Sequence, residues 1–97
     1  MWIGIEGEDV DSATASQLAV EGGAMVKRVQ TGSPAADGGI EAQDVIVALD
    51  SRTVTSMSDL VVGLRSRKPG ETVTLGYLRD GRPGVAHITL VERPKNP

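Results

Sequence analysis

The pattern of hydrophobic and polar positions divides this chain into short strands. Residues 71–92, ETVTLGYLRDGRPGVAHITLVE, alternate apolar and polar side chains on both sides of Asp80-Gly81 and predict a long β-hairpin. The run DVIVALD at 44–50 is almost continuously apolar, which indicates a strand buried on both faces. The segment AMVKRVQ at 24–30 predicts a further short strand.

The opening stretch, MWIGIEGEDV, alternates like a strand but contains two glycines. A glycine inside a strand weakens it and often marks a place where another backbone or a ligand comes close. After this stretch, residues 11–20 predict a loop with one helical turn, ended by Gly22-Gly23.

Two segments predict helices. In TGSPAADGGI, at 31–40, Ser33 is placed as the N-cap and Pro34 as the first helical residue, with Gly38 or Gly39 as the stop. The clearer helix is SMSDLVVGLRSRKPG at 56–70, which Ser56 or Ser58 could cap and Pro69-Gly70 would end. Its apolar residues at helical spacing are Met57, Leu60, Val61 and Leu64.

These elements predict a single mainly β domain of five to six strands and two helices. With no Phe, one Trp and one Tyr, its core must consist of Val, Ile, Leu and Ala. The net charge of −3 is modest, and the scattered Lys and Arg residues argue against a nucleic-acid surface. No apolar run approaches the roughly 18 residues of a membrane-spanning helix, so we expect no direct membrane insertion.

Residues for catalysis or metal binding do not form a recognisable constellation. His87 is the only histidine, and we expect it on the solvent face of the hairpin, with no serine in a nucleophile-elbow context. The chain has no cysteine, which together with a single histidine argues against a transition-metal site. The acids Glu6, Glu8, Asp9 and Asp11 lack the glycine and closing Glu of an EF-hand and are interpreted as a solvated loop. We therefore predict no catalytic residues, no metal and no cofactor.

Several motifs in order resemble a PDZ domain of the bacterial HtrA (DegP/DegS-like) serine-protease family. They are GAMV at 23–26, GSPAADGGI at 32–40, KPGETV at 68–73 and RDG at 79–81, and the resemblance runs from residue 3 to about 90. Gln43 stands where the family usually has glycine, so it must adopt the backbone angles of that turn. The resemblance implies a PDZ-like, partly open β-barrel or sandwich over residues 1–92, followed by a disordered polar tail at 93–97.

The resemblance also explains the opening glycines. PDZ domains carry an X-Φ-Gly-Φ loop that leads into the strand receiving a peptide, and Trp2-Ile3-Gly4-Ile5 matches it. An extended peptide can add to a sheet edge, and a loop containing glycine lets backbone N–H groups approach a terminal carboxylate. The implied peptide-binding residues are Ile3, Gly4, Ile5, Glu6, Gly7, Met57, Val61 and Leu64.

In this reading, the helix at 56–70 forms the second wall of the peptide groove. Met57, Val61 and Leu64 would face the groove, while Leu60 faces the core. Because Met57 stands where many PDZ domains carry a hydroxyl-binding His, the second pocket should prefer apolar residues. Leu64→Ala should then cost less stability than the about 2–5 kcal/mol of a fully buried Leu.

Two points about this groove stay open at the level of sequence. The same apolar residues could simply belong to the core. Only Met1 and Trp2 precede Ile3, so the cation that many PDZ domains place before the Gly loop is either cut off or supplied elsewhere, with Arg65, Arg67 and Lys68 as candidates by charge alone.

By resemblance, we expect a peptide-binding module excised from a larger, trypsin-like serine endopeptidase of the periplasm or cell envelope. Its partners would be apolar C-terminal ends of misfolded or substrate proteins, together with the protease domain of the parent chain. Three alternatives remain: a PDZ domain of another membrane-associated protease or secretion component, a structural inter-domain or oligomer contact, and a small stand-alone hydrolase.

Overall fold

The computed structural model of the protein describes residues 4–91, so Ile3 and the tail at 93–97 lie outside the described residues. The described part is mainly β, as the sequence predicts, with six strands and three short helices. In chain order these are β1 (Ile5–Asp9), α1 (Ser12–Leu18), β2 (Ala24–Val29), α2 (Pro34–Asp37), β3 (Val45–Leu49), β4 (Arg52–Thr53), α3 (Met57–Arg65), β5 (Thr72–Arg79) and β6 (Arg82–Thr89).

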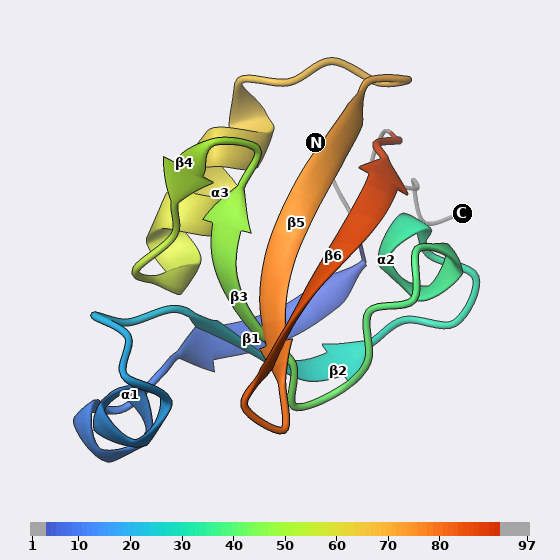
Figure 1. The fold of residues 1–97 in the computed structure, drawn as a ribbon. Coiled ribbons are helices and arrows are strands. Elements are labelled where there is room, and N and C mark those ends of the chain that lie inside the picture. Colours follow the sequence, from blue (N-terminus) through green and yellow to red (C-terminus); the bar gives the residue numbers. More distant parts are fainter. Residues whose placement is uncertain (1–3, 92–97) are drawn as a thin grey trace.

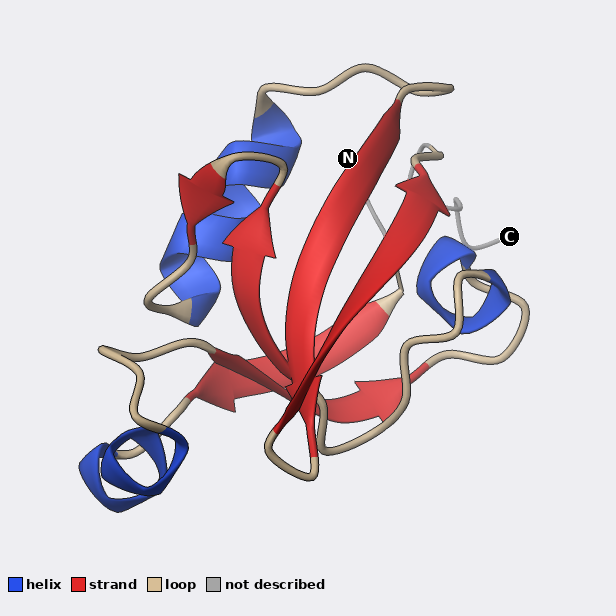
Figure 2. Cartoon of the chain, viewed as in Figure 1, coloured by secondary structure: helices blue, strands red, loops and turns tan. Residues whose placement is uncertain are grey.

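The strands form one antiparallel sheet in the order β1-β2-β3-β5-β6, with the short β4 paired to β3. The sheet is strongly bent, because β1 and β2 run across the molecule while β3, β5 and β6 rise steeply from them (Figure 1). The helices lie around the sheet: α3 contacts β1 and β2 and faces the β3–β4 turn across a small hollow, and α2 lies beside β6 (Figure 2). This topology leaves β1 and β6 at the two ends of the strand order, each with one open edge, and the two-residue β4 pairs only with β3.

The core is built from aliphatic side chains of the sheet and one helix. The largest fully buried hydrophobic side chains are Ile46, Leu49, Leu60, Leu75, Ile88, Leu90, Val26 and Val73. Leu60 of α3 has no exposed surface, which confirms the prediction that it faces the core. Burying one such side chain contributes about 1.5–3 kcal/mol to stability, so aliphatic side chains form the hydrophobic core of this chain without Phe.

The turns follow the chemistry expected from the sequence. The hydroxyl of Ser33 accepts the N–H of Ala36, and Pro34 follows at the first position of α2. Asp80 and Gly81 both have positive φ, as a type I′ hairpin turn requires. Gln43 has φ 75°, so it does adopt the left-handed turn conformation that glycine would take more easily.

Two expectations about the N-terminal third were wrong. Residues 12–18 form a seven-residue helix, α1, rather than a loop with a single turn, and Asp11 caps it by accepting the N–H of Thr14 at 2.7 Å. The acidic residues also do not form one solvated loop. Glu6, Glu8 and Asp9 belong to β1, and only Asp11 lies beyond it.

Within residues 4–91, no helix is long and apolar enough to cross a lipid bilayer. The same residues contain no group of three or more His, Asp or Glu side chains arranged to hold a metal ion.

Candidate functional site

The edge strand β1 directs part of its backbone away from the sheet. Its one strand partner among the described residues is β2. Directly after β2, the N–H of Gln30 donates to the carbonyl of Gly4 at 2.8 Å. At the other end of β1, the N–H of Val10 donates to the carbonyl of Gly23 at 3.0 Å. Because backbone groups alternate in direction along an antiparallel strand, the odd residues of β1 present their N–H and C=O groups to the open edge. Ile5 and Gly7 are the two such residues nearest to Gly4.

Gly4 precedes this edge in a left-handed conformation, with φ 84°. Most residues with a Cβ disfavour that region, so glycine allows the sharp entry into β1. The carbonyl of Gly4 accepts the N–H of Gln30, the residue directly after β2, which fixes the loop against the sheet. The structure thus brings Gly4, Ile5, Glu6 and Gly7 together at one end of the edge, while Ile3 lies outside the described residues.

Helix α3 supplies the three apolar side chains predicted for the second wall. Met57 is half-buried against the core, Val61 is 37% exposed, and Leu64 is 5% exposed within the core cluster. The exposed fraction therefore falls from Val61 to Leu64 on this face of α3. Leu64 is nearly as buried as Leu60, so the structure gives no reason for the smaller stability cost expected of Leu64→Ala.

Gly7 allows α3 to lie close to the edge strand. A Cβ on Gly7 would lie 2.5 Å from the carbonyl oxygen of Met25 and 3.3 Å from the Sδ atom of Met57. The first distance is shorter than any normal contact, so a side chain at this position would push β1 from β2. The thioether of Met57 occupies the space that a side chain on Gly7 would fill.

The N-terminus of α3 is held by three polar side chains. The hydroxyl of Ser56 accepts the N–H of Asp59 at 3.0 Å, and the carboxylate of Asp59 accepts both the hydroxyl and the N–H of Thr55. These two bonds, the hydroxyl bond first, lower the pKa of Asp59 below its ordinary value of 3.8. In addition, Oδ1 of Asp9 accepts the N–H of Met57 at 2.7 Å. Sequence reasoning missed this role of Asp9, because nothing in the sequence indicates a contact between residues 48 positions apart.

On the other face of β1, acidic side chains lie next to basic side chains of β2. Glu8 forms an ion pair with Lys27 of β2 at 2.9 Å, and Glu6 lies directly opposite Arg28 in the sheet register. All four side chains are exposed. Such pairs add little stability in water, and this face is close to neutral despite its two acids.

Of the three cations named for carboxylate binding, Arg67 is already engaged elsewhere. Its guanidinium forms an ion pair at 2.6 Å with Asp50, the residue directly after β3. Arg65 and Lys68 are exposed.

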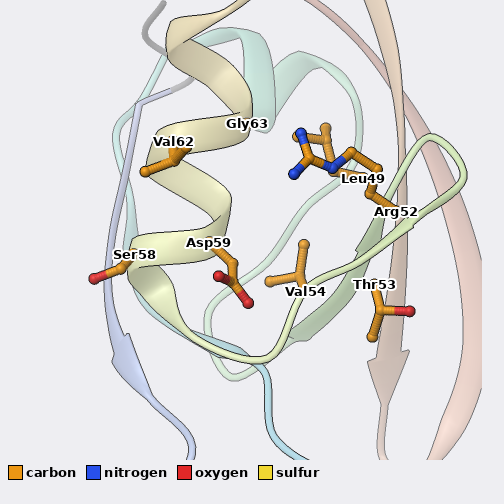
Figure 3. A pocket seen from close by; sticks show the side chains of 8 residues that line it. All are labelled: Leu49, Arg52, Thr53, Val54, Ser58, Asp59, Val62 and Gly63. Atoms are coloured by element: carbon orange, nitrogen blue, oxygen red, sulfur yellow. The ribbon is translucent and has the colours of Figure 1, made fainter.

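A separate hollow of about 170 Å³ lies on another face of α3, between this helix and the β3–β4 turn (Figure 3). Asp59 and Val62 line it from the helix, and Arg52 and Val54 line it from the other side. Around the helix axis, the α3 residues that line this hollow lie about 150° from Met57 and Val61. It is smaller than the roughly 300–1,000 Å³ of typical small-molecule pockets.

A family profile described as the PDZ domain matches residues 2–90. Among curated proteins, the periplasmic pH-dependent serine endoprotease DegQ of Escherichia coli is 37% identical over 91% of this chain and 20% of its own length. The chain spans about a fifth of the length of the curated relatives that it matches.

Solved structures with the same fold include complexes with peptides. The HtrA-type protease AlgW with a decapeptide superposes with a TM-score of 0.83 and 25% identity, over 98% of this chain and 30% of that one. The HtrA3 PDZ domain bound to a phage-derived ligand, FGRWV, gives a TM-score of 0.76 and 25% identity, over 91% of this chain and 82% of that one.

Proposed function

This chain belongs to the PDZ domain family, and we propose that it binds the C-terminal ends of polypeptides in a groove between β1 and α3. The ligand would add to β1 as an antiparallel strand and lie beside the apolar residues of α3. The observation that carries this proposal is the register of β1, which turns the backbone groups of Ile5 and Gly7 toward the open edge. Solved structures with this fold include an HtrA-type protease with a decapeptide and an HtrA3 PDZ domain bound to a phage-derived ligand, which supports a peptide-binding role.

The end of the ligand would lie at the Gly4 loop. N–H groups of Ile3, Gly4 and Ile5 would bind the terminal carboxylate, because a loop without a Cβ at its centre lets an anion approach the backbone. The terminal side chain would enter the apolar space beside Val61 and Leu64. Burial of one apolar side chain there, with charge-assisted hydrogen bonds, predicts only roughly micromolar affinity.

We propose further that the domain is the peptide-recognition part of an HtrA-type serine protease. Its curated relatives are serine endoproteases, several of them named as periplasmic, and each is far longer than this chain. In such a protein, the domain would recruit misfolded or substrate proteins to the protease domain of the same chain, in the periplasm or cell envelope. The domain itself would be non-catalytic, which agrees with the exposed position of His87 and its hydrogen bond to the Thr74 hydroxyl.

The test is a fluorescence-anisotropy titration with peptides that end in Val, either as the free acid or as the amide. A charge-assisted hydrogen bond contributes about 1.5–3 kcal/mol, so amidation should weaken binding by about tenfold or more. Equal affinities for the two forms would contradict recognition of the terminus.

Neighbouring residues of α3 provide a matched pair of variants for the same titration. Val61→Lys places a charge at the rim of the groove and should abolish binding. Val62→Lys places the same charge one residue later, where the side chain is 58% exposed and lines the separate hollow, and it should leave the affinity unchanged. Equal effects of both variants would exclude this face of α3 from the site.

A further inference from the structure

A single hydrogen bond joins the edge strand to the start of the helix across the proposed groove. Oδ1 of Asp9, the last residue of β1, accepts the N–H of Met57, the first residue of α3, at 2.7 Å. The first N–H groups of a helix have no partner within the helix. Ser56 caps the helix locally through the N–H of Asp59, and Asp9 supplies the acceptor for the N–H of Met57 from a distant strand.

The same helix residue also contacts the strand through its side chain. Gly7 lies two positions before Asp9, on the same face of β1, and the Sδ atom of Met57 is 3.3 Å from where its Cβ would be. Met57 is thus held to β1 at two levels, by its backbone at Asp9 and by its thioether over Gly7. Further along the helix, Val61 remains 37% exposed. The strand and the helix are consequently joined at the end of β1 that lies far from Gly4.

From this geometry we infer that Asp9 is a positioning residue that fixes the width of the groove beside Gly7 and so selects small ligand side chains at that level. The inference rests on the proposed function. A peptide whose last residue pairs with Ile5 places its third-from-last residue beside Gly7, because side chains and outward backbone groups both repeat every two residues. The side chain of that ligand residue meets Met57, and the bond to Asp9 prevents α3 from moving away to admit a large one.

The experiment compares two peptides that share the same apolar terminal residue and differ in Ala or Phe at the third position from the end. For the wild-type domain, we expect the Phe peptide to bind about tenfold more weakly, equivalent to 1.4 kcal/mol. Asp9→Ala removes the acceptor and should reduce this ratio to within about threefold, mainly by strengthening binding of the Phe peptide. Asp9→Asn retains a side-chain oxygen as acceptor and should preserve the ratio.

Asp11→Ala is the matched control. Asp11 also accepts a backbone N–H at a helix N-terminus, at 2.7 Å, but it does so on α1 rather than on α3. This variant should keep the wild-type ratio. Asp9→Leu is similar in size to Asp and lacks an acceptor, so it provides a second test should Asp9→Ala fold poorly.

The outcomes separate this inference from the proposed function. A ratio that collapses in Asp9→Ala and Asp9→Leu, but not in Asp9→Asn or Asp11→Ala, supports the role of Asp9. A wild-type ratio near one, or a ratio unchanged in Asp9→Ala, overturns that role while peptide binding itself stands. If the wild-type domain binds neither peptide, the proposed function fails first.

Discussion

Met57 packs over Gly7, with its Sδ atom 3.3 Å from the position of a Cβ that Gly7 lacks. The helix that would cover the ligand and the strand that would pair with it therefore meet where the strand has no side chain. This contact gives the glycine a steric purpose that does not depend on its backbone flexibility.

Gly7→Ala should destabilise the domain by about 1–3 kcal/mol, as overpacking in a close contact does. The thioether of Met57 can move away from the added Cβ. The carbonyl oxygen of Met25, 2.5 Å from that Cβ, belongs to the neighbouring strand and cannot move alone. Chemical denaturation measures the effect, and peptide affinity should fall with it because the edge of β1 shifts. Glu6→Ala, at an exposed position of the same strand, should change stability by less than about 0.5 kcal/mol. Similar effects of the two substitutions would contradict the close packing at Gly7.

Leu60→Ala and Leu64→Ala should both destabilise the domain by about 2–5 kcal/mol, since both side chains are buried in the core cluster. Denaturation alone will therefore not distinguish core from groove. A panel of peptides ending in Ala, Val, Leu and Phe should distinguish a core residue from a groove residue, because only Leu64 is expected to border the space for the terminal side chain. We expect Leu64→Ala to shift preference toward larger terminal residues and Leu60→Ala to leave the ranking unchanged. A changed ranking in Leu60→Ala would mean that the helix face has been assigned incorrectly.

The fold could be predicted from the sequence wherever local chemistry determines it. Asp80-Gly81 between two alternating runs specifies the β5–β6 hairpin, and Ser33-Pro34 specifies the start of α2. Helix α1 was missed because its seven residues include Ser, Thr and Gln and show little apolar periodicity. What stabilises it is the cap from Asp11, a signal that the sequence contained and that was interpreted as part of an acidic loop.

The candidate site was predictable in its residue types but not in its long-range contacts. The order of the motifs predicted the Gly4 loop, the strand that follows it and the helix wall. In contrast, the bond from Asp9 to Met57 and the pairing of Arg67 with Asp50 join residues far apart in the chain. Periodicity and spacing carry no information on such pairs, which is also why Leu64 was expected to be more exposed than it is.

Acid should weaken the cap of α3. The hydrogen bonds from Thr55 lower the pKa of Asp59 in the folded state, so its contribution to stability is present above the ordinary value near 4. That contribution is lost as the pH falls below about 4 toward the lower folded-state pKa. Asp59→Asn should therefore lose stability relative to wild type at pH 7, and the difference should shrink below about pH 3.5. Urea denaturation at a series of pH values measures this, and a difference that grows on acidification would contradict the assignment.

The buried carboxylate of Asp44 should make Arg79 important for stability. Asp44 is 1% exposed and receives both Nε and Nη2 of Arg79, at 2.8 and 2.7 Å. Arg79→Met leaves this carboxylate with the N–H of Glu41 as its remaining partner, which should cost about 1–3 kcal/mol. Arg82→Met, an exposed position next to the hairpin turn, is the control and should be nearly neutral. Comparable thermal denaturation midpoints for both variants would contradict the role of this pair.

The central claim is that a peptide adds to the open edge of β1 beneath α3, and amide NMR of the domain titrated with a free-acid peptide tests it most directly. We predict that the amides of Ile5 and Gly7 shift strongly and become protected from hydrogen exchange, together with shifts at Val61. The other edge strand provides the internal control, and its exposed Val85 should remain unchanged. Shifts confined to β6, or no protection at Ile5 and Gly7 when the peptide is saturating, would contradict the account.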